Sequence, residues 1–321
     1  MRKYKKIFTA GTILLAVIFF LLVSGSCNTT KEEIANADTT SLWYGWNQYQ
    51  IKPEDTLVRL GYDIISNTYA YFGPHGKISS ITNGMNCQNC HINGGIIPWG
   101  NNFGAVIVSY PKFSYRMGAT MTLSRRINDC FERSLNGTAL DTNSREMKAI
   151  IAYMHWLDEG VTQKPAGSGI MKLSYLNRAA DTTKGKLVFI NSCQRCHGKN
   201  GEGQPNENGG FVYPPLWGDR SYNTGAGMYR LLTIAGFVKN NMPYLEALYS
   251  HTVLTDEEAL DVSAFINSQP RPLIKNKQDY PDISKKEVDN PVGPYSDTFP
   301  EIQHKYGPFK EIAAVHAAKT K

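Results

Sequence analysis

Two short stretches with one pattern decide how this chain folds: CQNCH at residues 87–91 and CQRCH at residues 193–197. In each stretch two cysteines lie three positions apart, and a histidine follows the second cysteine directly. Thiols at this spacing can form thioethers with both vinyl groups of one haem, while the imidazole binds the iron. The pattern therefore predicts two covalently bound c-type haems, held by Cys87, Cys90, His91, Cys193, Cys196 and His197.

Two other kinds of site also use C-x-x-C pairs. Zinc ribbons join two such pairs, but here more than 100 residues separate them, which is far longer than usual. A thioredoxin-type redox pair gives no reason for a histidine directly after the second cysteine in both stretches. Haem attachment accounts for all six residues, so the chain is expected to be a dihaem cytochrome.

The first 26 residues are typical of an export signal. Four basic residues open the chain, an apolar run covers residues 7–23, and three small residues precede Cys27. Small residues before a cysteine resemble a bacterial lipoprotein cleavage site. An uncleaved anchor and an ordinary signal peptide are the alternatives, and all three place the protein outside the cytoplasm. We expect a lipoprotein-type signal peptide at residues 1–26, a lipid anchor to the membrane at Cys27 and a tether at residues 27–41, in the periplasm or cell envelope.

Composition excludes other classes of protein. The 321 residues are 41% hydrophobic, which is enough for about two domains with their own cores. The net charge is +6, but without the four basic residues of the leader 30 basic residues remain against 28 acidic ones. A body so close to neutral disfavours nucleic-acid binding.

The order of elements predicts a mainly α fold. Residues 183–270 read as a class I cytochrome c domain, with helices over residues 184–192, 227–238 and 256–267, the last capped by Thr255. Residues 42–160 repeat this plan as an N-terminal haem domain, with helices over residues 57–72, 119–135 and 145–157. A Pro- and Gly-containing linker at residues 161–182 joins the two domains.

The tail, residues 271–321, is rich in proline and has little helical periodicity. It is expected to be an extended strap. Its aromatic residues favour packing against the domains over disorder: Tyr280, Tyr295, Phe299, Tyr306 and Phe309. The predicted fold is thus two cytochrome c-like haem domains in tandem with an extended C-terminal strap.

The sixth iron ligand distinguishes electron carriers from catalytic haems. For the second haem the candidates are Met228, Lys239 and Met242. Met242 follows a predicted helix and directly precedes a proline, where single-haem cytochromes usually supply a thioether. We expect Met242 to ligate, Lys239 to be solvated and Met228 to fill the core.

For the first haem, Met117 and Met121 could serve, but the fifth cysteine of the body offers another ligand. Cys130 could be a buried free thiol. A spare thiol is a hazard in an oxidising compartment unless something holds it, and haem iron would do so. A thiolate ligand would also lower that haem's potential relative to a His/Met haem.

Arg126, Cys130 and Ser134 are four residues apart, so on a helix they form one stripe. An arginine and a hydroxyl beside a reactive sulfur could bind an oxyanion. Alternatively, Arg126 could pair with a haem propionate while Ser134 faces water.

These residues resemble the dihaem thiosulfate dehydrogenases, which couple two thiosulfates to tetrathionate. The likeness covers roughly residues 42–310. Besides the haem motifs it rests on RINDCFERS at residues 126–134, SREMK at 144–148, NMP at 241–243 and QHKYGPF at 303–309. Some members have a lysine directly before the methionine of the second haem, where this chain has Asn241, which favours plain His/Met ligation.

The resemblance implies that Cys130 is the distal ligand of the catalytic haem and binds the sulfur substrate, with Arg126 and Ser134 near that substrate. Electrons would pass from a His/Cys haem to a His/Met haem and on to an external acceptor such as a small cytochrome. The competing class is a non-catalytic dihaem cytochrome that carries electrons for another envelope oxidoreductase. Only the enzyme needs a cysteine that substrate can reach.

Overall fold

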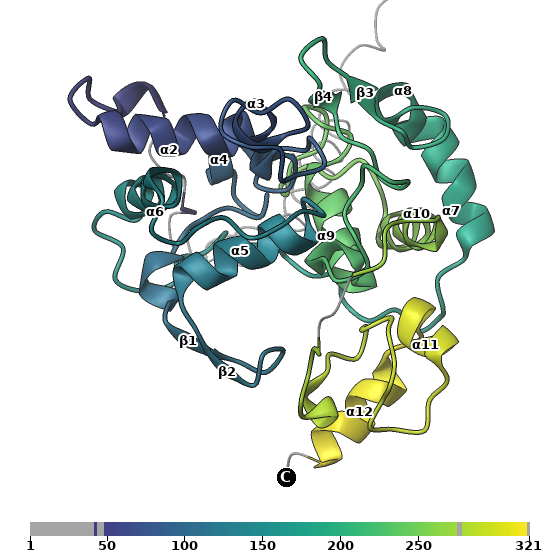
Figure 1. Ribbon diagram of the computed structural model, residues 1–321. Helices are drawn as coiled ribbons and strands as arrows, with labels where there is room; N and C mark the ends of the chain where they lie inside the picture. The colour runs from purple at the N-terminus through teal and green to yellow at the C-terminus, as the bar shows by residue number, and fades with distance from the viewer. Residues whose placement is uncertain (1–41, 44–47, 275–277, 320–321) are drawn as a thin grey trace, which may run out of the picture. The chain divides into compact units, whose positions relative to one another are not determined.

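A computed structural model describes residues 42–43, 48–274 and 278–319. The expected signal peptide, the tether and the lipid-anchor residue Cys27 lie outside these residues. Among the described residues, no helix is both long enough and apolar enough to cross a membrane. Helices dominate, and the only sheets in the described part are two small antiparallel pairs, β1 with β2 and β3 with β4 (Figure 1).

The first half places its helices around the first C-x-x-C-H stretch (Figure 1). Its elements are the single turn η1 (Gln48–Gln50), α2 (Thr56–Ser66), α3 (Thr68–Phe72), the single turn η2 (Cys87–Asn89), α4 (Ile92–Gly95), the single turn η3 (Ile107–Ser109), β1 (Lys112–Ser114), β2 (Ala119–Met121), α5 (Leu123–Arg133) and α6 (Arg145–Leu157).

The second half has the same plan around the second stretch. Its elements are α7 (Thr182–Val188), the π-helical turn η4 (Phe189–Cys193), α8 (Gln194–His197), β3 (Gln204–Pro205), β4 (Phe211–Tyr213), the single turn η5 (Gly227–Tyr229), α9 (Leu231–Asn241) and α10 (Asp256–Ser268). The tail adds the single turn η6 (Ile283–Lys285), α11 (Glu301–Tyr306) and α12 (Lys310–Lys319).

In each half the first and the last helix cross at a glycine. In the first half α2 packs on α6, and a Cβ at Gly61 would lie 2.0 Å from the carbonyl oxygen of Ala149. In the second half α7 packs on α10, and a Cβ at Gly185 would lie 1.9 Å from the carbonyl oxygen of Asp261. The helices approach this closely only because neither glycine has a side chain. The shared crossing supports the expectation that the two halves repeat one plan.

We expect Gly185→Ala to lower the free energy of unfolding by about 1–3 kcal/mol or more, because the added methyl group must force α7 away from α10. Lys186→Ala is the matched control, since Lys186 lies on the same helix and is exposed. Denaturant midpoints of the holoproteins, followed by the helical circular dichroism signal, compare the two. Equal midpoints would show that the crossing tolerates a side chain.

Two helices of the first half differ from the expectation. The predicted helix over residues 57–72 breaks at Asn67, and Thr68 beyond the break accepts a hydrogen bond from the backbone N–H of Cys87 at 3.0 Å. The predicted helix over residues 119–135 begins only at Leu123, because residues 119–121 pair with residues 112–114 and Thr122 caps the helix. The predicted helix over residues 145–157 is confirmed.

In the second half the expected helix over residues 184–192 becomes a short α-helix followed by a π-helical turn. The expected helix over residues 227–238 is a single turn followed by α9, which extends to Asn241. The last helix follows the prediction closely, and Thr255 caps it by accepting a hydrogen bond from the Glu258 backbone N–H at 3.1 Å.

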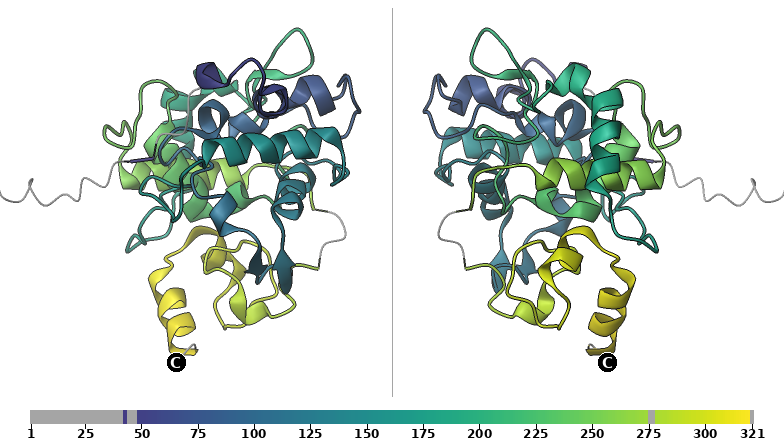
Figure 2. Two further views of the ribbon diagram at one scale, coloured as in Figure 1. Left: turned by 90° about the vertical axis from the view of Figure 1, so that its left-hand side faces the viewer. Right: turned by 90° about the vertical axis from the view of Figure 1, so that its right-hand side faces the viewer.

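The tail is extended only in part. Residues 301–306 and 310–319 are helical, because Pro300 and Pro308 precede these helices without interrupting them. Phe309 and Ile312 are buried against the second half, as the aromatic content of the tail suggested. The prediction of a strap that is extended throughout was therefore wrong for these residues, which form the yellow helices of Figure 2.

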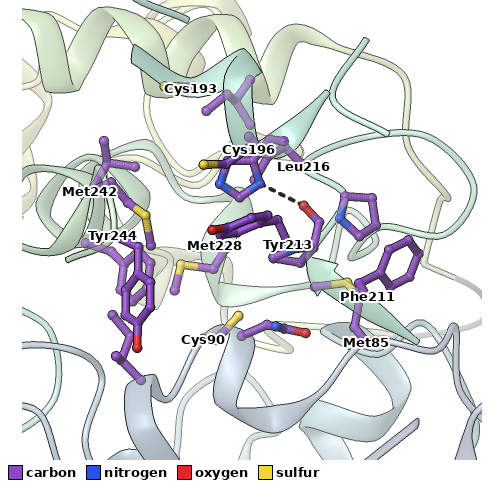
Figure 3. A pocket seen from close by; sticks show the side chains of 18 of the residues that line it. Met85, Cys90, Cys193, Cys196, Phe211, Tyr213, Leu216, Met228, Met242 and Tyr244 are labelled. Atoms are coloured by element: carbon purple, nitrogen blue, oxygen red, sulfur yellow. Dashed lines mark hydrogen bonds between the residues drawn. The ribbon is translucent and has the colours of Figure 1, made fainter. Parts of the chain in front are cut away.

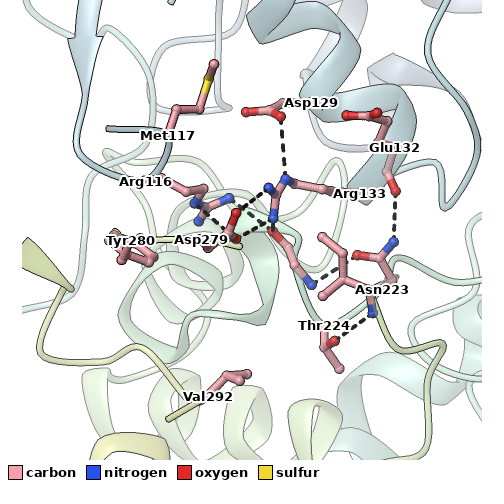
Figure 4. Close-up of polar contacts among 12 residues, drawn as sticks. Arg116, Met117, Asp129, Glu132, Arg133, Asn223, Thr224, Asp279, Tyr280 and Val292 are labelled. Carbon is pink, nitrogen blue, oxygen red and sulfur yellow. Dashed lines mark hydrogen bonds and ion pairs between the residues drawn. The ribbon is translucent and has the colours of Figure 1, made fainter. Parts of the chain in front are cut away.

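The tail also contacts helix α5. Arg133, near the end of that helix, donates from both terminal nitrogens to the carboxylate of Asp279, each at 2.7 Å. Its Nε lies 3.6 Å from the carboxylate of Asp129 (Figure 4). A buried guanidinium paired in this way needs each of its partners. The network ties the tail to the helix that carries Cys130.

Candidate functional site

His91 is fixed for binding a metal through one ring nitrogen. Its Nδ1 lies 2.5 Å from the backbone oxygen of Asn101, and its ring stacks on Phe103 with centroids 4.4 Å apart. A carbonyl accepts only from a protonated Nδ1, so Nε2 keeps its lone pair. Burial lowers the pKa of His91 to about 4, which keeps the imidazole neutral, as a ligand must be.

His197 repeats this arrangement in the second half. Its Nδ1 lies 2.8 Å from the backbone oxygen of Pro214, drawn as the dashed line in Figure 3, and burial lowers its pKa. The two histidines differ in how far along the chain the accepting carbonyl lies from the imidazole. Two different loops therefore produce the same arrangement. Both imidazoles are prepared as Nε2 ligands.

No disulfide joins the four sulfurs of the two stretches. Burial raises the pKa of Cys87, Cys90 and Cys193 to about 12, so these three groups stay neutral. Among the described residues, no three His, Cys, Asp or Glu side chains converge to hold a bare metal ion, as a zinc ribbon would require.

A cavity of about 390 Å³, the first cavity, contains the first stretch. Cys87, Cys90 and His91 line it together with Cys130 and with apolar side chains from several elements: Ile65, Phe103, Leu123, Ile127, Phe131, Leu135, Ile150 and Met154. Two thiols, a prepared imidazole and a further sulfur in one largely apolar cavity fit a c-type haem with its axial ligands.

Helix α5 brings the expected stripe into this cavity. Arg126, Cys130 and Ser134 all line it, the last as the residue that ends the helix. The Nη1 of Arg126 donates to the Cys130 sulfur at 3.2 Å. That sulfur is the main reason why the pKa of Arg126 lies above its ordinary value, so the guanidinium stays charged beside it.

The other methionines proposed for the first haem lie elsewhere. Met117 lines a different cavity near the tail, and Met121 is buried without lining the first cavity. Of the three sulfur candidates for that haem, Cys130 alone lines the first cavity.

A second cavity of about 280 Å³ contains the second stretch. Met242, the residue that follows α9, lines it with Cys193, Cys196 and His197, and Met228 lies in the same space (Figure 3). Lys239 does not line it, because its ammonium pairs with Asp256. The thioethers of Met85, Met228 and Met242 line this cavity, and no lysine amine does.

The two cavities share part of their wall. Met85, Asn86, Cys90 and Met228 line both of them. Core contacts also cross between the halves, since Ile92 packs in the core of the second half and Phe211 in that of the first. One layer of side chains thus separates the two cavities, in which the two haems would lie.

Charge distinguishes the two cavities. Among the described residues that line them, the first has Lys112, Arg126 and Lys164 and no aspartate or glutamate, while the second has no lysine, arginine, aspartate or glutamate. The first cavity is therefore suited to an anion, and the second is not.

Sequence reasoning missed several groups of the first cavity. The carbonyl of Asn101, the ring of Phe103 and the side chains of Tyr110, Lys112 and Lys164 come from loops or short strands without a periodic pattern. The high Gly and Asn content after the first stretch was the one available signal that this loop folds back onto it.

Comparisons with known proteins agree with this geometry. The family model described as "SoxA/TsdA, cytochrome c domain" matches residues 78–162, and the model "Cytochrome c" matches residues 182–270. A protein of Psychrobacter arcticus named thiosulfate dehydrogenase is 40% identical over 239 residues, which are 71% of this chain and 69% of that protein. The chain belongs to the thiosulfate dehydrogenase family. A thiosulfate dehydrogenase of Allochromatium vinosum is 42% identical over 201 residues, covering 61% of this chain and 73% of the relative.

A solved structure agrees as well. The thiosulfate dehydrogenase TsdBA from Marichromatium purpuratum superposes with a TM-score of 0.65 at 31% identity, covering 78% of this chain and 54% of that one. The chain thus spans about half the length of that structure's chain. The mainly helical fold with two cytochrome c domains in tandem is confirmed, and these domains imply haem c.

Proposed function

We propose that the protein is an exported dihaem cytochrome c that oxidises two thiosulfates to tetrathionate. His91 and Cys130 would hold the first haem, and His197 and Met242 the second. The four cysteines of the two stretches would form the thioethers. Lipid attachment at Cys27 would keep the enzyme at the cell envelope. Membership of the thiosulfate dehydrogenase family and the two cytochrome c domains support this proposal.

The sulfur chemistry takes place at Cys130. Its thiolate and the outer sulfur of thiosulfate form a sulfur–sulfur bond, which leaves a thiosulfonate on the cysteine and releases two electrons. The outer sulfur of a second thiosulfate then attacks the outer sulfur of the adduct. The bond to Cys130 breaks, tetrathionate leaves and the thiolate is regenerated. Bound haems would supply the acceptor for the two electrons and the path to an external acceptor, with His91 and Cys130 holding one haem and His197 and Met242 the other. The same steps in reverse would reduce tetrathionate.

One observation carries the proposal. The Cys130 sulfur lies 3.2 Å from a guanidinium nitrogen of Arg126, in the same cavity as the thiols and the imidazole of the first stretch. A cation beside a nucleophilic sulfur can bind the sulfonate of a substrate that approaches this sulfur. An electron carrier alone does not require such a cation.

A steady-state assay tests the proposal. Purified holoprotein should oxidise thiosulfate with an artificial electron acceptor and yield tetrathionate, and tetrathionate with a reductant should give the reverse rate. Absence of both activities in protein with a full haem content would support the electron-carrier alternative.

Replacement of Arg126 by leucine should raise the KM for thiosulfate and lower kcat/KM by about tenfold to a hundredfold, because a dianion loses a charge-assisted partner. Both haems should keep their spectra. Arg125→Leu is the matched control, because Arg125 lies on the same helix but pairs with Asp129 and Glu132 outside the cavity.

Unchanged thiosulfate kinetics in Arg126→Leu would assign Arg126 to a haem propionate. The anion site would then have to be sought elsewhere, for instance at Arg145, the first residue of α6. A loss of the thiolate-ligated spectrum together with activity would show that Arg126 acts by holding Cys130, not by binding substrate.

A further inference from the structure

Lys112 is a cation without a carboxylate partner. It is exposed, lines the first cavity and forms no ion pair with any residue in the described part of the chain. By contrast, Arg125 on the neighbouring helix α5 forms ion pairs with two carboxylates, one of them that of Asp129. An unpaired cation facing a cavity without acidic residues is available to a bound anion.

The hairpin of β1 and β2 determines where this cation lies. In its register Lys112 pairs with Met121, and the residue after Met121 is Thr122, which caps α5. Lys112 therefore lies close to the start of α5, and Arg126 lies at the end of the first turn of that helix. Both residues line the first cavity.

Tyr110 connects the two cations. The Nζ of Lys112 lies 4.6 Å from the centroid of the Tyr110 ring, a cation–π distance that holds the flexible lysine over the ring. Tyr110 and Arg126 both line the first cavity, and after the sulfur of Cys130 the Tyr110 side chain also raises the pKa of Arg126. Lys112, Tyr110, Arg126 and Cys130 thus all line the wall of this cavity. Lys164 lines it as well.

The proposed reaction brings a thiosulfate dianion to an adduct that already carries an anionic sulfonate. Arg126 is already engaged with the sulfur that carries the first thiosulfate. The second thiosulfate must approach that adduct against repulsion between like charges. A second cation beyond Arg126 would reduce this repulsion and would hold the far sulfonate of the product.

The geometry points to a second sulfonate subsite formed by the Lys112 ammonium and the Tyr110 hydroxyl. This inference rests on the proposed function and specifies its substrate class: linear sulfur anions with a sulfonate at each end, one bound at Arg126 and the other at Lys112. The attacking thiosulfate enters through this subsite. Lys112 and Tyr110 are thus residues that determine specificity for disulfonates over single sulfonates.

Equilibrium binding tests the subsite separately from turnover. The dihaem holoprotein carrying Cys130→Met lacks the thiolate needed for the adduct, so calorimetry can measure tetrathionate and thiosulfate binding in it. Adding Lys112→Gln should weaken tetrathionate binding about tenfold and thiosulfate binding at its tightest site less than about twofold. Adding Lys112→Arg instead should restore tetrathionate binding.

Lys77→Gln is the matched control. Lys77 is also an exposed lysine over a tyrosine ring, 3.7 Å from the centroid of Tyr71, but it does not line the first cavity. Lys77→Gln should leave the affinities for tetrathionate and thiosulfate unchanged. Because Lys112 is exposed and unpaired, its replacement should cost little stability.

Three outcomes would overturn the subsite. The first is an equal affinity for tetrathionate with and without the Lys112 side chain, and the second is a loss of affinity of equal size for tetrathionate and thiosulfate. The third is an unchanged affinity for tetrathionate together with a shifted reduction potential of the first haem. The third would show that Lys112 pairs with a haem propionate. Failure of the proposed function is a separate result, because it appears as absence of thiosulfate oxidation in the unaltered holoprotein.

Discussion

Cys130→Ser and Cys130→Gly should each abolish thiosulfate oxidation, with a loss of about 10³-fold or more. Neither a hydroxyl group nor a hydrogen atom can form the sulfur–sulfur bond on which turnover depends. The same variants should lose the low-spin signal of thiolate-ligated ferric haem in electron paramagnetic resonance. The His/Met signal of the second haem should stay, since Met242 and His197 line a different cavity from Cys130.

Cys130→Met separates ligation from chemistry. Methionine can bind iron, so the first haem should remain six-coordinate, but it has no thiolate to carry the adduct and the variant should be inactive. Substantial turnover in Cys130→Met would show that the cysteine is only a ligand. If the unaltered protein has no thiolate-ligated haem and Cys130 is dispensable, the electron-carrier function replaces the enzyme.

Met242→Gly should spare covalent haem attachment and lower the reduction potential of the second haem, because a thioether stabilises the ferrous state more than water, amine or amide donors do. Electron exit should slow as a result. A spectroelectrochemical titration that resolves the two haems measures the change.

Met228→Leu is the control for this prediction. Met228 lines the second cavity too and is buried, so a leucine of similar volume keeps the packing and removes only the sulfur. The potential of the second haem should stay close to that of the unaltered protein. An unchanged potential in Met242→Gly would exclude Met242 as the ligand, and a large drop in Met228→Leu would assign that role to Met228.

The sequence was sufficient where a pattern is local. The C-x-x-C-H spacing places two thiols and an imidazole within a few residues, so no knowledge of the fold was needed. The four-residue spacing of Arg126, Cys130 and Ser134 predicts one helix face, and α5 presents all three to the first cavity. Such predictions succeed because helix geometry alone fixes the contacts.

The remaining features depend on tertiary contacts. The carbonyls of Asn101 and Pro214 orient the histidines from loops whose path no periodicity encodes. Strands of three residues such as β1 and β2 are too short to show alternation, so the position of Lys112 could not be predicted. The break at Asn67 has the same origin, because Thr68 beyond it contacts Cys87.

The tail shows a different source of error. Its proline content favours extended structure over helices, but a proline just before a helix lacks only an N–H that the helix would not use. Residues 310–319 are rich in alanine and begin after Pro308, so they form α12. Proline content predicts the ends of helices better than their absence.

Mixing one equivalent of thiosulfate with the fully oxidised holoprotein, without an external acceptor, tests covalent chemistry at Cys130 most directly. Both haems should become reduced while intact-protein mass spectrometry detects one thiosulfate bound to Cys130, and Cys130→Met should show neither change. Haem reduction without an adduct on Cys130, or no reduction at all in protein that carries both haems, would contradict covalent thiosulfate chemistry at this cysteine.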